Sequence, residues 1–226
     1  GFYYFTSKGG EIDGSEVPRY AGLAVLGADQ SRAITVNEIS TIGSLWPLAS
    51  QFTDEQSISG SANGLLIGSQ HVQNLADIST GTFGATVLNG NNLTFSETVA
   101  RMNTLAALMS LCGAQKDAGN CEKFLNTTNG NNTLMALRNI AVQPYLNSNE
   151  IFALFTTAFP YPEGKERRAT NFLPYLSYVP DDFALMVRFS GGGIYSPGRL
   201  MFDNRGQLWS GQNWIFPTTR CVMKWY

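Results

Sequence analysis

Apolar residues recur at helical spacing through most of the middle of the chain. In five stretches they fall three or four residues apart, which places them on one face of an α-helix. The clearest stretch is residues 96–112, where Val99, Met102 and Leu105 begin a broad apolar face that ends at Cys112. The other four stretches are residues 33–52, 60–79, 133–144 and 147–159. This pattern predicts a helical body.

Polar residues and prolines mark where several of these helices begin and end. Asn37 is placed to cap the first helix, and Pro47 either kinks that helix or starts a new one. Asn147 and Glu150 have the spacing of a capping box, and Pro144 ends the helix before them. These signals predict separate helices joined by short connections.

Strand signals lie near both ends of the chain. Residues 2–6 are aromatic and β-prone, and apolar and polar residues alternate along residues 183–189. Residues 200–209 hold two apolar runs around a turn that contains glycine, which is typical of a β-hairpin. We also expect a short helix after Pro18, carrying Tyr20 to Val25, and a short strand over residues 85–88.

Together these elements predict a mainly α protein, a compact multi-helix domain with short β-segments at both termini. We divide it into a terminal strand at residues 1–16, a helical domain at 17–180 and β-segments at 181–226. Both ends start or stop abruptly, so we expect them to be cut from a longer protein. The strand at residues 2–5 needs a partner. We expect it to pair with a C-terminal β-segment, with strand addition to a neighbouring protein as the alternative.

Composition and charge suggest an exported protein. The chain is 43% hydrophobic and 14% charged with a net charge of −2, and it is rich in Gly, Asn, Ser and Thr. Such a weak field gives no electrostatic case for binding nucleic acid or anionic membranes. No apolar run approaches the length of a transmembrane helix. We therefore favour an extracellular, cell-surface or periplasmic location.

The three cysteines refine this interpretation. Cys112 and Cys121 frame a short polar loop that a disulfide can close, and two free thiols are the alternative. Cys221 is then left over, either free or paired outside this chain. No Cys-x-x-Cys and no Cys/His cluster occurs, so we expect no zinc or haem.

The sequence offers no catalytic constellation and no cofactor motif. His71 is the only histidine, and no nearby residue suggests a partner base, nucleophile or metal ligand, so we assign it a structural role. The pairs Asp181-Asp182 and Asp203-Asn204 are better explained as turn caps than as calcium ligands. We expect no catalytic residue, no metal site and no cofactor.

Aromatic residues concentrate in the last eighteen positions of the chain. They are Trp209, Trp214, Phe216, Trp225 and Tyr226. One interpretation is a surface that binds protein or, with weaker support, carbohydrate. The alternative, which we favour, is a core for strands packing on the helical body or on further strands.

Several stretches in this order carry a family resemblance. They include "ITVNEISTIGSLWPLASQF", "GLLIGSQHVQNLADISTGT", "NTLAALMSLCGA", "TLMALRNIAVQP" and "SPGRLMFDNRGQLW". From about residue 1 to about residue 217 the chain resembles a helical module of large exported bacterial proteins. There the module follows an immunoglobulin-like or carboxypeptidase-regulatory-like domain and precedes an NHL or streptogramin-lyase-like β-propeller. "PEGKERRAT" and "TTRCVMKWY" depart from that pattern.

The resemblance implies that the C-terminal hairpin begins the first blade of such a propeller. The catalytic residues of a lyase-like propeller would lie beyond this chain. We therefore expect a non-catalytic structural or protein-interaction module of an exported protein. Two alternatives stay open. One is a fragment of a propeller enzyme whose active site lies outside this chain, and the other is an accessory subunit held in a larger assembly by its terminal β-segments.

Overall fold

The fold is known from a computed structural model that describes residues 1–12, 14–28, 33–54, 56–113, 118–189, 197–212 and 223–225. It is mainly α with short β-segments, as predicted. The helices are α1 (Glu38–Leu45), α2 (Ala62–Leu75), α3 (Gly90–Phe95), α4 (Thr98–Ser110), α5 (Ala118–Thr128), α6 (Thr133–Val142) and α7 (Ser148–Ala158), with two 3₁₀ helices, η1 (Trp46–Gln51) and η2 (Leu111–Gly113).

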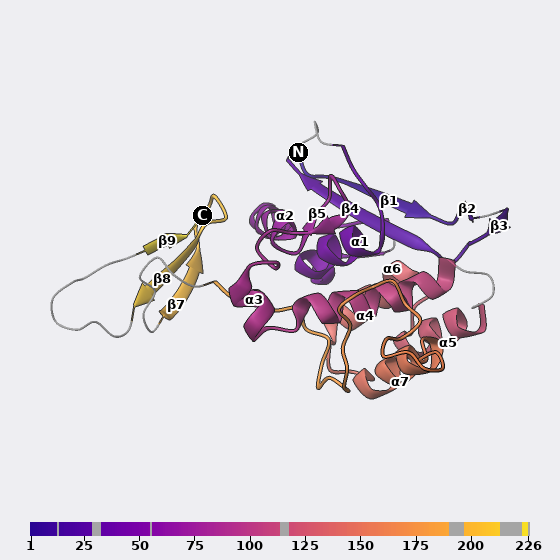
Figure 1. Cartoon of the computed structure of the whole chain (residues 1–226). Coiled ribbons are helices and arrows are strands. Elements are labelled where there is room, and N and C mark those ends of the chain that lie inside the picture. Colours follow the sequence, from indigo (N-terminus) through magenta and orange to yellow (C-terminus); the bar gives the residue numbers. More distant parts are fainter. Residues whose placement is uncertain are drawn as a thin grey trace.

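The strands form small antiparallel ladders. They are β1 (Tyr3–Lys8), β2 (Glu11–Ile12), β3 (Ser15–Glu16), β4 (Ala21–Gly27), β5 (Ala76–Asp77), β6 (Thr82–Phe83), β7 (Pro197–Phe202), β8 (Leu208–Gln212) and β9 (Met223–Trp225). β1 pairs with β4, β2 with β3, and β5 with β6, while β7, β8 and β9 form one sheet in that order. Figure 1 shows this C-terminal sheet at one end of the molecule, beyond α2 and α3.

Helix α4 is the centre of the core. The residues predicted for its apolar face are buried, and so are Asn103, Thr104 and Leu108 on its other sides. α4 is therefore surrounded rather than half-exposed. The β1–β4 ladder packs on α1, α1 packs on α4, and α5 and α7 lie toward the opposite side of the body (Figure 1).

Helix capping follows the sequence at one predicted site and departs from it at another. Asn37 caps α1, where its side chain accepts from the Ser40 amide and the Ser40 hydroxyl accepts from the Asn37 amide. Pro47 starts η1 as a new helix. Asn147 does not form the predicted capping box, because its backbone is left-handed at φ 56° and its amide group donates to Thr127 O instead.

The expected helix after Pro18 is wrong, because Ala21–Gly27 forms strand β4. β1 pairs with this strand, Tyr4 opposite Val25 and Phe5 opposite Ala24. The expected pairing of residues 2–5 with a C-terminal segment is therefore wrong. Strand addition to a neighbouring protein stays a prediction, because β1 has a strand partner on one edge only among the described residues. β4 is buried on both faces, so its sequence lacks the alternation that marks a half-buried strand. A Cβ at Gly22 would lie 2.6 Å from Val36 Cγ1, which explains the glycine at this close approach.

The second edge of β4 is closed by helix side chains instead of another strand. The Thr133 hydroxyl on α6 accepts from the Ala21 amide at 2.8 Å and donates to Ala21 O at 2.7 Å. The Leu23 amide donates to Thr41 Oγ1, and the Val25 amide donates to Ser44 Oγ, both on α1. Alternate residues of β4 thus find hydroxyl partners where a third strand would otherwise pair.

Residues 183–189 also differ from the prediction of a strand. They run without regular structure, and helix side chains bind their backbone. Thr98 Oγ1 accepts from the Met186 amide and donates to Met186 O, which repeats the arrangement of Thr133 with Ala21. Arg101 on α4 donates to Ala184 O and pairs with Asp182 at 2.6 Å. The alternating pattern marks an extended segment whose partner is a helix.

The expected strand at 85–88 is likewise wrong, because those residues form turns.

Candidate functional site

The C-terminal sheet begins with the predicted hairpin. β7 and β8 are antiparallel, with Met201 opposite Trp209 and Phe202 opposite Leu208. Asp203 organises the turn between them, because Oδ1 accepts from the amides of Arg205 and Gln207. Its second oxygen accepts from Trp209 Nε1 at 2.9 Å. Both carboxylate oxygens thus bind protein donors, which is the turn-capping role predicted for this residue.

The outer edge of β7 has no backbone partner among the described residues. Asp203 N donates to Gln207 O, and hydrogen-bonded pairs alternate along an antiparallel ladder. Met201 therefore bonds to Trp209 across the ladder, while the amide and carbonyl of Leu200 and Phe202 point to the free edge. Pro197 at the start of β7 is typical of an edge strand.

Apolar side chains lie exposed along this edge. The exposed fractions are 60% for Leu200, 69% for Met201 and 41% for Phe202. Phe95 on α3 is also exposed, at 66%, with the Arg188 guanidinium 4.1 Å from the centre of its ring. Exposed apolar side chains on a free strand edge are a recognised basis for association with another strand.

Charge is distributed unevenly along the chain. Residues 183–226 contain five of the 15 Lys and Arg residues but one of the 17 Asp and Glu residues, Asp203. The C-terminal segment therefore carries a formal charge of +4, and residues 1–182 carry −6. Of these five basic residues, Arg199 lies on β7 and Arg205 in the turn that follows it. A segment of positive charge is complementary to an acidic surface.

A groove lies where the hairpin meets the body. Its volume is about 510 Å³, and its walls come from η1, α2, residues 185–189 and Phe202 of β7. The His71 ring meets the Phe202 ring edge to face, with centroids 5.7 Å apart, and Gln70 Nε2 donates to Arg205 O. Burial lowers the pKa of His71 below its usual range, so its imidazole is neutral at pH 7. His71 thus joins α2 to the sheet.

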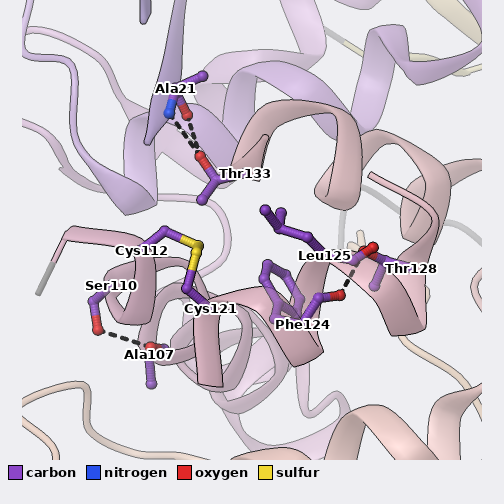
Figure 2. The surroundings of a disulfide bond; sticks show 9 residues. All are labelled: Ala21, Ala107, Ser110, Cys112, Cys121, Phe124, Leu125, Thr128 and Thr133. Atoms are coloured by element: carbon purple, nitrogen blue, oxygen red, sulfur yellow. Dashed lines mark hydrogen bonds between the residues drawn. A yellow bond between two sulfur atoms is a disulfide. The ribbon is translucent and has the colours of Figure 1, made fainter. Parts of the chain in front are cut away.

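The structure contains the disulfide between Cys112 and Cys121 (Figure 2). It links η2, at the end of α4, to the first turn of α5. The surroundings shown in Figure 2 include the hydrogen bonds of Thr133 with Ala21 at the closed edge of β4. Cys221 lies outside the described residues.

The other predicted site residues are placed only in part. Trp209 is half-buried in β8, with its indole bonded to Asp203. The backbone of Trp225 pairs with Leu208, but its side chain lies outside the described part of the chain. Trp214, Phe216 and Tyr226 also lie outside it.

The sequence pattern does not reveal the groove. Trp46, His71 and Phe202 come from three distant parts of the chain, and each has the local pattern of an ordinary core or edge residue. Among residues with described positions, no cluster of His, Cys, Asp or Glu is arranged to hold a metal ion. In the same residues, no helix is long and apolar enough to cross a membrane.

Comparison with known proteins adds no relative. No protein-family model matches the chain, and no match was found among curated proteins or solved structures. The site must therefore be interpreted from its own geometry.

Proposed function

We propose that this chain is a non-catalytic structural or protein-interaction module of an exported protein, and that β7 pairs with a strand of an acidic partner domain. One observation carries the proposal. The backbone groups of Leu200 and Phe202 face an edge with no partner among the described residues, while the edge of β4 is closed. Strand addition supplies main-chain hydrogen bonds to such an edge and covers its apolar side chains.

Two further features support this role. The positive C-terminal segment would attract an acidic partner and disfavour a basic one. The disulfide between Cys112 and Cys121 is compatible with an oxidising location, since such bonds persist mainly in exported proteins. Carbohydrate as a partner has weaker support, because Leu200 and Met201, the two most exposed apolar side chains of β7, are not aromatic.

A second candidate rests on the same sheet. Three antiparallel strands in chain order, with an Asp203 turn between the first two, fit the beginning of a propeller blade. In that case the partner strand would belong to the same polypeptide, and any lyase-like activity would lie outside this chain. The strand-pairing surface is the same in both candidates, so one experiment tests it for both.

The test uses two amidated peptides that differ only in charge, one alternating valine with glutamate and one alternating valine with lysine. Hydrogen exchange and NMR shifts at Leu200 and Phe202 report on pairing at the edge. We expect the glutamate peptide to protect both amides and to bind about tenfold more tightly at low salt. Equal binding of the two peptides would contradict an acidic partner, and no protection by either would contradict the function.

Two variants of Leu200 separate the contribution of its backbone amide to binding from that of its side chain. Leu200→Pro removes the outward-facing amide, whereas Leu200→Ala shortens the side chain and keeps that amide. Leu200 does not bond across the ladder, so the hairpin should tolerate either change. We expect Leu200→Pro to abolish binding of the glutamate peptide and Leu200→Ala to weaken it by no more than about threefold. Equal loss in the two variants would mean that strand pairing is not the mode of binding.

A further inference from the structure

The groove between α2 and the hairpin has the size and lining of a ligand site. Small-molecule sites are mostly apolar clefts of roughly 300–1,000 Å³ with a few polar groups, and this groove holds about 510 Å³. Ile67, Val187 and Phe202 are among its apolar lining residues. α2 packs closely on η1 beside it, since a Cβ at Gly68 would lie 2.4 Å from Leu48 Cδ2.

Two buried polar atoms of residues that line the groove lack a hydrogen-bond partner in the described structure. They are Trp46 Nε1, a donor, and Gln51 Oε1, an acceptor. The Nε1 atom of Trp209, in contrast, donates to Asp203. Buried polar groups are normally satisfied by protein or by water, and neither of these two has a protein partner here.

The lining carries no formal charge at neutral pH. His71 is its only ionisable member among the described residues, and burial holds its pKa below the usual value. A charged ligand would enter without a counter-ion, which is costly in an apolar site. The groove therefore favours an uncharged ligand.

We infer that this groove binds an apolar residue of a peptide through its uncharged backbone amide. The carbonyl would accept from Trp46 Nε1, the N–H would donate to Gln51 Oε1, and the apolar side chain would contact the groove lining. Both polar atoms are covered from solvent here, so a bound amide reaches them only when the atoms that cover them move. This inference is independent of strand pairing at β7.

N-acetyl-L-phenylalaninamide is a suitable probe, and the single histidine simplifies its detection. His71 gives the only imidazole signals of the chain, and the Trp46 indole N–H signal is assigned by its loss in Trp46→Phe. We expect the amide to shift both signals with saturation in the millimolar range, while the Trp209 indole signal stays unchanged. N-acetyl-L-phenylalanine, which carries a carboxylate, should bind at least about tenfold more weakly.

Two phenylalanine substitutions on neighbouring positions of α2 provide a matched pair. Ile67→Phe enlarges a residue that lines the groove, whereas Leu66→Phe enlarges one that lines a different cavity. We expect Ile67→Phe to abolish the His71 shift and Leu66→Phe to preserve it, with thermal unfolding showing that both variants fold. Trp46→Phe keeps an aromatic ring but loses the N–H, and should weaken binding about fivefold, the effect of one neutral hydrogen bond.

Three results would overturn the inference. One is a His71 shift with maltose but none with the amide, which would indicate a carbohydrate site. Another is equal binding of the amide to the folded Ile67→Phe variant and the wild-type chain. The third is no response of His71 to the amide at concentrations well above the millimolar range. Leu200 does not line the groove and reports on β7, whereas His71 and Trp46 report on the groove, so failure at one site is distinguishable from failure at the other.

Discussion

Strands β4 and β7 differ in whether the backbone groups on their second edge have hydrogen-bond partners. Each pairs with one neighbour, and each has a second edge with no further strand among the described residues. On β4, the hydroxyls of Thr133, Thr41 and Ser44 occupy that edge. On β7, the corresponding backbone groups stay open beside exposed apolar side chains.

The difference shows where this chain can accept another strand. A helix packed on a strand edge excludes any further strand, and its hydroxyls satisfy backbone groups that would otherwise be buried without a partner. The body is closed to strand addition along β4, because the edge residues and their partners are buried. Strand addition is thereby excluded at β4, while the outer edge of β7, like that of β1, has no strand partner among the described residues.

Removing a hydroxyl from the closed edge should have the largest effect. Thr133→Val keeps the shape of the side chain but leaves the amide and carbonyl of Ala21 unsatisfied, and both residues are almost fully buried. We expect the free energy of unfolding to fall by about 3 kcal/mol in a urea titration.

Thr133→Ser is the matched control, because it restores the hydroxyl and removes only a methyl group. Its loss of stability should stay at about 1 kcal/mol. If Thr133→Val and Thr133→Ser destabilise equally, the hydroxyl does not close the edge and the contrast between β4 and β7 loses its physical basis.

The disulfide should stabilise the same region by almost as much free energy. Cys112 and Cys121 are nine residues apart, and closing such a loop stabilises by about 2–3 kcal/mol in the chain-entropy model. We expect Cys112→Ala with Cys121→Ala to lower the free energy of unfolding by that amount. Hydrogen exchange should rise in α5 and at Ala21 but not in β7 or β8. Faster exchange confined to β7 and β8 would show that the disulfide supports the sheet instead, and alkylation of both thiols in the native protein would show that no bond forms.

A more exposed pairing of the same kind should lose less stability when its hydroxyl is removed. Thr98 binds both backbone groups of Met186 as Thr133 binds those of Ala21, but the Met186 side chain is 57% exposed. Water can replace the lost partner there, so Thr98→Val should cost about 1 kcal/mol in the same urea titration. A loss as large as that of Thr133→Val would mean that burial does not set the cost of opening an edge.

Much of the helical fold is predictable because its periodicity is local. The apolar faces of α1, α2, α4, α6 and α7 appear in the sequence, and Asn37 correctly marks the start of α1. β4 is not predictable in this way, since burial on both faces removes the alternation and its Ala and Leu residues also suit a helix. The sequence pattern also misses α5, whose buried positions lie within a polar, Asn- and Gly-rich stretch.

The candidate sites also differ in how far the sequence predicts them. The hairpin is predictable because the turn at Asp203 and its flanking apolar runs are adjacent in sequence. The closed edges depend on pairs such as Ala21 with Thr133, which are 112 residues apart. The groove likewise joins Trp46, His71 and Phe202, and no single-sequence pattern connects residues that meet only after folding.

The smallest expected effect concerns the contact between His71 and Phe202, which joins α2 to the C-terminal sheet. His71 lies against Phe202 without another ionisable residue in the described lining of the groove, and burial lowers its pKa in the folded state. The unfolded chain then binds the proton more readily, so stability is complete above about pH 6.5 and falls as pH decreases toward the folded-state pKa. We expect the free energy of unfolding to decline modestly over this range in the wild-type chain and to stay flat in His71→Phe, which keeps a ring against Phe202. Because His71 is the only histidine, a decline that persists in His71→Phe would show that this contact does not sense pH. A rise in wild-type stability over the same range would show that the imidazolium is favoured against Phe202.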